Sequence, residues 1–265
     1  MARKLLMARI SYIFPTDQPT GKRRLLAGLL DALADEQFHT FVCCVAFAKL
    51  NPLLKMAESI HAWNSRGGRI IGFFGIDHLG TSHQALEFGL QHFRRLYITH
   101  YPYSTFHPKI YMFLGGRSAR LFIGSQNLTV GGTETNFEAA TCLDFVLPEE
   151  RPFLLESSRF WLSLLPPACA STYRATDQIL KAHLEDNLLL DETKAPKRSA
   201  KDEDNANGNN DTKKPRTFYR KGFPARPAKP LPKPNKKPAQ QGGTSVNVLI
   251  NNPSKAAKGL AIQIK

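Results

Sequence analysis

The feature that most constrains the fold of this chain is the alternation of short apolar runs with helix-like segments through its first 150 residues. Six runs are short and rich in β-branched and aromatic residues, which predicts strands at 40–48, 70–76, 95–99, 108–114, 119–124 and 138–145. Apolar residues at helical spacing predict helices at 24–33, 51–63 and 82–93 and two closing helices at 148–165 and 177–190. This alternation is typical of an α/β domain with a covered, mixed sheet.

Charge divides the chain into two parts. Residues 1–190 hold 19 basic and 16 acidic side chains, a net charge of +3, whereas residues 191–265 hold 17 and 6, a net charge of +11. The second part also contains 9 of the 18 prolines. We therefore expect one globular domain at 1–190, a basic, Pro-rich disordered linker at 191–245, and a short strand-like segment at 246–265 that resembles a hairpin or the start of a further domain.

Several classes of protein are excluded by composition. No stretch approaches the roughly 18 consecutive apolar residues of a membrane span, and Arg9 interrupts the N-terminal apolar run that a secretory signal needs. The four cysteines (Cys43, Cys44, Cys142 and Cys169) lack the spacing of a zinc set, and adjacent cysteines in a strand point to opposite faces. We expect a cytoplasmic protein with no metal, no cofactor and no membrane association.

The residues that carry chemistry lie between positions 106 and 138. His107 and Lys109 are two apart at the start of a predicted strand, so their side chains project from the same face. Ser125 and Asn127 are also two apart, at the end of the next strand. If the two strands form a hairpin, all four side chains meet at one edge of the sheet, and Glu138 opens the strand that follows. An imidazole, a cation, a hydroxyl, an amide and a carboxylate suffice for phosphoryl transfer without a metal.

Other residues near this segment have weaker claims. Tyr101 and Tyr103 lie on the predicted loop before His107 and are candidate substrate contacts, although such loops are more often packing elements. Gly124 is a candidate contact too, with an ordinary strand-end glycine as the alternative. Asp77 is expected to cap the turn before Gly80, and the alternative is that it supports the site from a neighbouring position.

The segment resembles the H-x-K…G-S-x-N signature of the phospholipase D superfamily. It is most similar to the metal-independent nucleases of that superfamily, among them restriction endonucleases of the BfiI type. The resemblance covers residues 25–165 and implies a phospholipase-D-like mixed sheet flanked by helices. It also implies that His107 is the nucleophile of a phosphohistidine intermediate, that Lys109 and Asn127 hold phosphate oxygens, that Ser125 positions the site, and that Glu138 hydrogen-bonds the imidazole.

The resemblance has further consequences. Only one H-x-K is present, whereas members of the family use two histidines per active centre, so a homodimer with a shared site is implied. The aspartate often found five residues after the lysine is Leu114 here, and the two parts of the signature are a few residues further apart than usual. The missing aspartate weakens a lipase interpretation more than a nuclease one.

The sequence thus predicts a metal-independent DNA phosphodiesterase, an endonuclease of restriction, defence or repair, with the basic tail as an arm for DNA phosphates. A soluble linker is the alternative for the tail. Two alternatives for the whole protein are a phospholipid phosphodiesterase with the same chemistry and an inactive dimeric module that binds nucleic acid.

Overall fold

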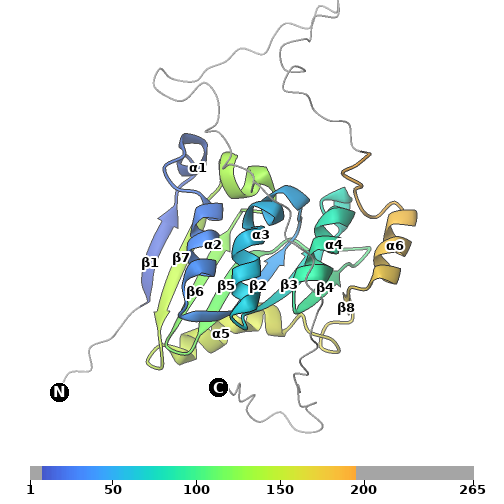
Figure 1. Ribbon diagram of the computed structural model, residues 1–265. Helices are drawn as coiled ribbons and strands as arrows, with labels where there is room; N and C mark the ends of the chain where they lie inside the picture. The colour runs from blue at the N-terminus through green and yellow to red at the C-terminus, as the bar shows by residue number, and fades with distance from the viewer. Residues whose placement is uncertain (1–7, 195–265) are drawn as a thin grey trace, which may run out of the picture.

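A single mixed sheet organises the molecule. The computed structural model describes residues 8–194, and in this part of the chain eight strands form one sheet in the order β1-β7-β6-β5-β2-β3-β4-β8 (Figure 1). Their bounds are β1 Arg9–Ile13, β2 Phe38–Val45, β3 Arg69–Gly75, β4 Arg95–Thr99, β5 Lys109–Gly115, β6 Ser118–Gly124, β7 Ala140–Val146 and β8 Thr172–Arg174. Strands β2, β3 and β4 are parallel, and the other neighbours pair antiparallel. The predicted α/β fold with a mixed sheet is confirmed.

Helices cover the two faces of the sheet unequally. One face packs against α2, α3, α4 and α6, which lie in front of the sheet in Figure 1, and the other face packs against α5. The helical elements are α1 Asp17–Thr20, α2 Leu25–Ala34, α3 Leu50–Ser65, the 3₁₀ turn η1 Asp77–Leu79, α4 His83–His92, the π-helical turn η2 Gly131–Thr135, α5 Arg151–Leu162 and α6 Asp177–Glu185. None of the helices in the described residues is long and apolar enough to cross a bilayer.

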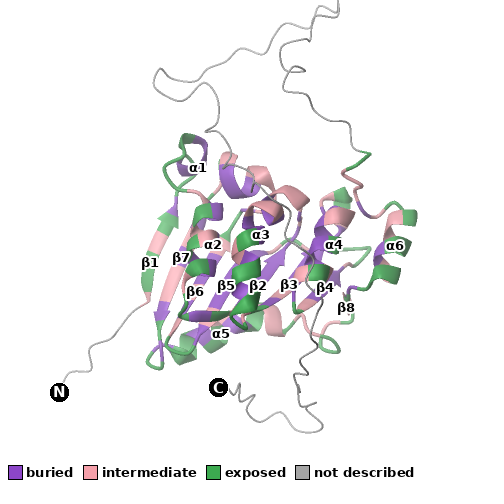
Figure 2. Ribbon diagram, viewed as in Figure 1, coloured by how far each residue is buried: buried purple, intermediate pink, exposed green. Residues whose placement is uncertain are grey.

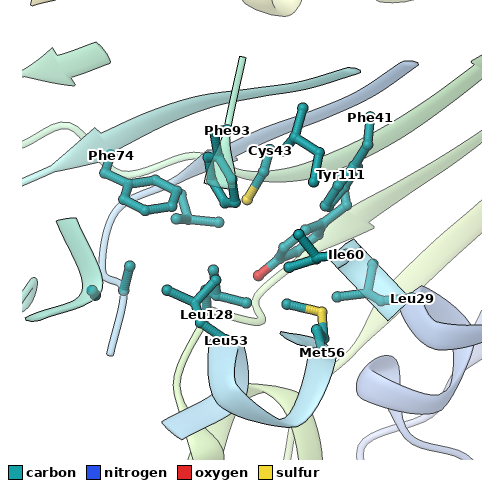
Figure 3. Packing of buried hydrophobic residues seen from close by; sticks show 14 of the residues in the cluster. Leu29, Phe41, Cys43, Leu53, Met56, Ile60, Phe74, Phe93, Tyr111 and Leu128 are labelled. Atoms are coloured by element: carbon teal, nitrogen blue, oxygen red, sulfur yellow. The ribbon is translucent and has the colours of Figure 1, made fainter. Parts of the chain in front are cut away.

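The larger core lies between the sheet and the four helices. Phe41, Cys43 and Tyr111 project from β2 and β5 onto Leu53 and Met56 of α3 (Figure 3). Cys44 belongs to the core on the opposite face, as the alternation of side chains in a strand requires. Figure 2 shows the result: the central strands are largely buried, whereas the outward sides of the helices are exposed.

The predicted elements agree with the structure to within a few residues, and β4 coincides with its predicted range. Ser82 caps α4, because its hydroxyl accepts a hydrogen bond from the Ala85 amide at 3.2 Å. Five elements were not predicted as strands or helices: β1, β8, α1, η1 and η2.

The C-terminal end of the described chain lies against the starts of α3 and α4. The Leu190 carbonyl accepts from the His83 amide at 2.9 Å, and the carboxylates of Asp191 and Glu192 accept from Gln84 and from the Leu50 amide. Contacts with the domain therefore continue through residue 192. The predicted linker from residue 195 onward and the predicted segment 246–265 lie outside the described residues.

Candidate active site

The predicted site residues meet at one edge of the sheet because three neighbouring strands begin or end there. Strand β5 starts at Lys109, and β6 ends at Gly124, with Ile110 paired to Ile123 in an antiparallel register. Strand β7 begins at Ala140, directly opposite Gly124. The expected hairpin is therefore present, and it carries the two halves of the H-x-K and G-S-x-N pattern to the same place.

His107 and Lys109 are in direct contact. The Lys109 ammonium lies 2.7 Å from Nδ1 and 2.9 Å from Nε2 of His107, and 3.0 Å from the His107 carbonyl oxygen. An ammonium group can only donate hydrogen bonds, so the ring nitrogen that meets it acts as the acceptor. The His107 side chain is open to solvent, whereas Lys109 is only 7% exposed. This pair presents an accessible imidazole with a cation held behind it.

Two opposing effects act on the charge of Lys109. Burial lowers the pKa of its ammonium, because a charged group loses hydration in the protein interior. The negative charge of Glu138 acts in the opposite direction and raises that pKa. The effect of burial is the larger one, so the pKa of Lys109 is lowered overall. The Glu138 carboxylate therefore helps to keep Lys109 protonated.

Ser125 connects the end of β6 to the residues that precede β7. Its hydroxyl donates to the Glu138 carboxylate and accepts from the Ala139 amide at 3.1 Å, and its own amide donates to the Ala139 carbonyl at 3.0 Å. Glu138 is thereby fixed at the site through Ser125. Within residues 8–194 the Glu138 carboxylate makes no hydrogen bond to His107, and the contact of Glu138 with the imidazole stays a prediction.

Asn127 is oriented by Phe47, which lies in the loop after β2. Its Oδ1 accepts from the amide of Phe47 at 3.2 Å, which leaves the Nδ2 hydrogens as the donors of that side chain. The Phe47 ring in turn meets the imidazole of His107 edge to face, with the ring centroids 6.0 Å apart. Phe47 thus connects the two halves of the signature, and nothing in its sequence position, near the end of the apolar run at 40–48, indicates this role.

Gly124 has a steric explanation. A Cβ at this position would lie 2.2 Å from the Ala139 carbonyl oxygen and 2.6 Å from Gln126 Oε1, closer than real Cβ contacts allow. Glycine is therefore required for β6 to approach the start of β7. Tyr101 and Tyr103 lie on the loop before His107 with exposed side chains, and their rings meet at 5.5 Å.

Asp77 is more closely involved in the site than its sequence context indicates. One carboxylate oxygen accepts from the amide of Phe106 at 3.0 Å, and the other lies 2.8 Å from Nδ1 of His100. Because Phe106 immediately precedes His107, this bond fixes the backbone that presents the His107 side chain. The position of Asp77 directly after a buried strand is the sequence signal for such a role.

A buried ion pair lies beneath the G-S-x-N segment. Lys55 of α3 and Glu134 of η2 form a salt bridge with side chains that are 3% and 0% exposed. Gly132, in the same turn, packs so closely on Asn127 that a Cβ would lie 2.3 Å from the Asn127 carbonyl oxygen. The pair holds the turn against α3, and a single lysine in a helical pattern gives no sign of it.

The geometry is suited to nucleophilic displacement at phosphorus. The hairpin brings an imidazole, an ammonium and an amide donor to the same edge of the sheet, and a phosphate monoanion bound there would be stabilised by charge-assisted hydrogen bonds. Among residues 8–194 no group of three or more His, Cys, Asp or Glu side chains is arranged to hold a metal ion.

Comparisons with known proteins bear on the fold. No family model matches the chain, and a search of curated proteins finds no similar sequence. Similar solved structures include NucT from Helicobacter pylori, at 13% identity over 63% of this chain and 99% of that one with a TM-score of 0.46. Nuc, a phospholipase D family member from Salmonella typhimurium, has 14% identity over 64% and 98% of the two chains and a TM-score of 0.41.

A phosphatidylserine synthase from Haemophilus influenzae is similar at 11% identity over 70% of this chain and 46% of that one, with a TM-score of 0.45. At such identities and TM-scores these similarities carry no argument for an activity, and the case for one rests on the geometry of the site itself. The mixed sheet flanked by helices that the resemblance implies is present in the structure.

Proposed function

We propose that the protein is a metal-independent phosphodiesterase that hydrolyses DNA through a phosphohistidine intermediate. The observation that carries this proposal is the contact between His107 and Lys109 at an open edge of the sheet, with Ser125 and Asn127 on the adjoining strand end. The expected role as an endonuclease of restriction, defence or repair belongs to the same proposal.

The contact between Lys109 and His107 defines how the site would meet a phosphate. The Lys109 ammonium donates to the His107 imidazole. A phosphate offers it a stronger, charged acceptor. When the Lys109 ammonium donates its hydrogen bond to a phosphate oxygen instead, a neutral imidazole nitrogen of His107 becomes free to attack phosphorus. The Nδ2 hydrogens of Asn127 then bind a second phosphate oxygen.

The reaction has two displacements. In the first, a His107 nitrogen forms a bond to phosphorus, the bond to the leaving oxygen breaks, and His107 of the partner subunit, as imidazolium, gives that oxygen its proton. In the second, the neutral imidazole of the partner's His107 accepts a proton from water as the water oxygen attacks phosphorus and the phosphorus–nitrogen bond breaks. Both histidines return to their starting states, so no metal or redox partner is needed.

A homodimer follows from this mechanism, because each chain supplies one such histidine. Exposed apolar side chains flank the site edge, including Leu79, which is 45% exposed, and Phe137, which is 64% exposed. These are suited to an interface that brings two sites together. Under random exchange of wild-type and His107→Ala subunits at equal amounts, about one quarter of the activity should remain, as only wild-type pairs are complete. One half remaining would contradict the shared site.

The decisive experiment uses plasmid DNA in excess EDTA, with nicking observed on a gel. We expect the wild-type protein to cut and His107→Ala to be inactive. His39→Ala is the matched control, because His39 is an exposed histidine at the start of β2, away from the site edge. Loss of cutting in both variants, or cutting by His107→Ala, would contradict the proposal. No cutting by the wild type would direct attention to phospholipid substrates.

The basic tail is proposed as an electrostatic arm for DNA phosphates. Residues 191–265 carry a net charge of +11, but Asp191 and Glu192 contact the domain, so a deletion should begin at residue 195. Loss of this arm should weaken DNA binding and reduce its dependence on salt. Unchanged binding at several salt concentrations would show that the tail is not an arm.

A further inference from the structure

A pocket of about 460 Å³ lies beside the proposed active site. It is lined by the turn at residues 76–79, the loop at residues 100–105 and residues 187–188. Pockets of a few hundred cubic ångströms are typical of sites for small organic groups. The proposed chemistry at His107 and Lys109 accounts for the phosphate and leaves this pocket without a role.

The wall of the pocket is continuous with the residues that hold the nucleophile. Thr105 lines the pocket two residues before His107, and Asp77 lines it while binding the Phe106 amide. On the other side, Gly80 packs directly on the Phe47 ring, where a Cβ would lie 1.9 Å from that ring. Since Phe47 contacts the His107 imidazole, the turn that walls the pocket is connected to His107 through Gly80 and Phe47 as well as through Phe106.

The lining offers aromatic rings and hydroxyls, and its carboxylate, that of Asp77, is already bonded to the Phe106 amide and to His100. Tyr101 is 49% exposed and Tyr103 is 86% exposed, so both rings are available to a ligand. His78 Nε2 lies 3.1 Å from the Thr105 hydroxyl and joins the two walls, and Ser104 adds another hydroxyl. Among the described residues that line the pocket none is a lysine or an arginine. Such a lining suits a flat, neutral heterocycle with a hydroxylated sugar better than a second phosphate.

The backbone of the pocket is strained. Within residues 8–194 the non-glycine residues with positive φ are His78 at 56°, Leu79 at 53° and Asn187 at 56°, and all three line this pocket. A left-handed conformation is unfavourable for a side chain such as leucine. Strain of this kind persists where the surroundings enforce it, and it clusters at ligand-binding sites. Here the bonds of Asp77 to Phe106 and His100 hold the turn in place.

We propose that this pocket binds the nucleoside next to the scissile phosphate, with its base against Tyr101 and Tyr103. The inference rests on the proposed function, because it assumes that the phosphate attacked by His107 belongs to a nucleic acid. A base in a single strand is free to enter, whereas a base in a duplex must first be unstacked. The pocket therefore favours single-stranded or locally opened DNA.

The test compares two end-labelled single strands of equal length, one of thymidine residues and one of abasic residues with the same phosphodiester backbone. We expect the wild-type protein to cleave the thymidine strand with a kcat/KM roughly tenfold higher, mainly through a lower KM, since base stacking on aromatic side chains is worth about this much. In Tyr101→Ala/Tyr103→Ala the ratio between the two substrates should fall to near one.

Tyr12→Ala is the matched control, because Tyr12 is 47% exposed and lies on edge strand β1, several strands away in the sheet. It should keep the wild-type ratio. A wild-type ratio near one, or a double variant that retains the wild-type ratio, would overturn the nucleoside pocket while leaving the phosphodiesterase intact. Failure of the wild type to cleave either strand would instead overturn the proposed function on which the pocket depends.

Discussion

The edge of the sheet that carries the site has two halves with different tasks. The half built from β5, β6 and β7 supplies the groups proposed to react, namely His107, Lys109, Ser125, Asn127 and Glu138. The half built from the ends of β2, β3 and β4 supplies Phe47 and Asp77, which hold those groups, and the walls of the pocket described above. The groups proposed to react are thus confined to one half, whereas the groups that position them belong to the other.

This division has a consequence for mutagenesis. A change in the reacting half should remove a charge or a donor from the phosphate and reduce the rate whatever the substrate. A change in the supporting half should act through geometry, so a conservative replacement that keeps one hydrogen bond should recover part of the activity. The following variants separate the two kinds of effect.

The largest effect is expected for Lys109→Met in the reacting half. Loss of the cation should lower kcat/KM by roughly a thousandfold, about 4 kcal/mol of transition-state stabilisation. Stability should not fall, because methionine fills similar space without a buried charge. Steady-state kinetics and thermal unfolding measure the two quantities. Lys22→Met, an exposed lysine before α2, is the control, and equal activity of both variants would show that the phosphate is held elsewhere.

The buried ion pair beneath the G-S-x-N segment should have the next largest effect, on stability. Lys55→Met breaks the buried ion pair by removing the ammonium from the Glu134 carboxylate, which should lower the free energy of unfolding by about 3 kcal/mol. The double variant Lys55→Met/Glu134→Leu should recover part of that loss. Denaturant unfolding provides the measurement, and a single variant as stable as the wild type would mean that the pair does not hold the turn.

Asp77→Ala in the supporting half should lower kcat roughly thirtyfold, because the backbone before His107 loses its anchor. Asp77→Asn should regain much of the rate, since its amide oxygen still accepts from Phe106. Asp31→Ala, at an exposed position of α2, is the control. Identical rates for Asp77→Ala and Asp77→Asn would argue that the carboxylate acts by charge and does not act by position.

The smallest effect is a displacement of the pH profile in Glu138→Gln. The Glu138 charge raises the pKa of Lys109, so its removal should lower that pKa further. The ammonium is then lost at a lower pH, and the alkaline limb of kcat/KM should move to lower pH. Glutamine still accepts from Ser125, which keeps the local structure. Glu58→Gln, on the exposed side of α3, should leave the limb in place. An alkaline limb that stays in place or moves to higher pH in Glu138→Gln would show that the Glu138 charge does not raise the pKa of Lys109.

The reacting half of the site is more predictable from sequence than the supporting half. Strands β5 and β6 are adjacent in the chain, so a short turn and the alternation of side chains suffice to place Lys109 near Ser125. By contrast, the contact of Phe47 with Asn127 spans 80 residues, and that of Asp77 with Phe106 spans 29. No local periodicity encodes such contacts, because they arise only when the parallel strands are in register.

The missed strands have a similar explanation. Strand β1 is an edge strand whose residues are mostly exposed, so its apolar pattern is weak, and β8 is three residues long. Each exists because a longer strand offers it an unpaired edge, β7 for β1 and β4 for β8. The left-handed His78 and Leu79 were likewise unpredictable, since neither residue type favours that conformation.

The way the described chain ends on α3 and α4 also fixes where everything after it is attached. Helix α3 begins shortly after β2, and α4 follows β3 and η1, so Asp191 and Glu192 are held at the same edge of the sheet as His107. If the tail binds DNA as proposed, a polyanion held by the positively charged residues beyond this point is tethered to the sheet edge that carries His107. Its effective concentration at the site is then set by the length of that tether, whatever the concentration in bulk solution.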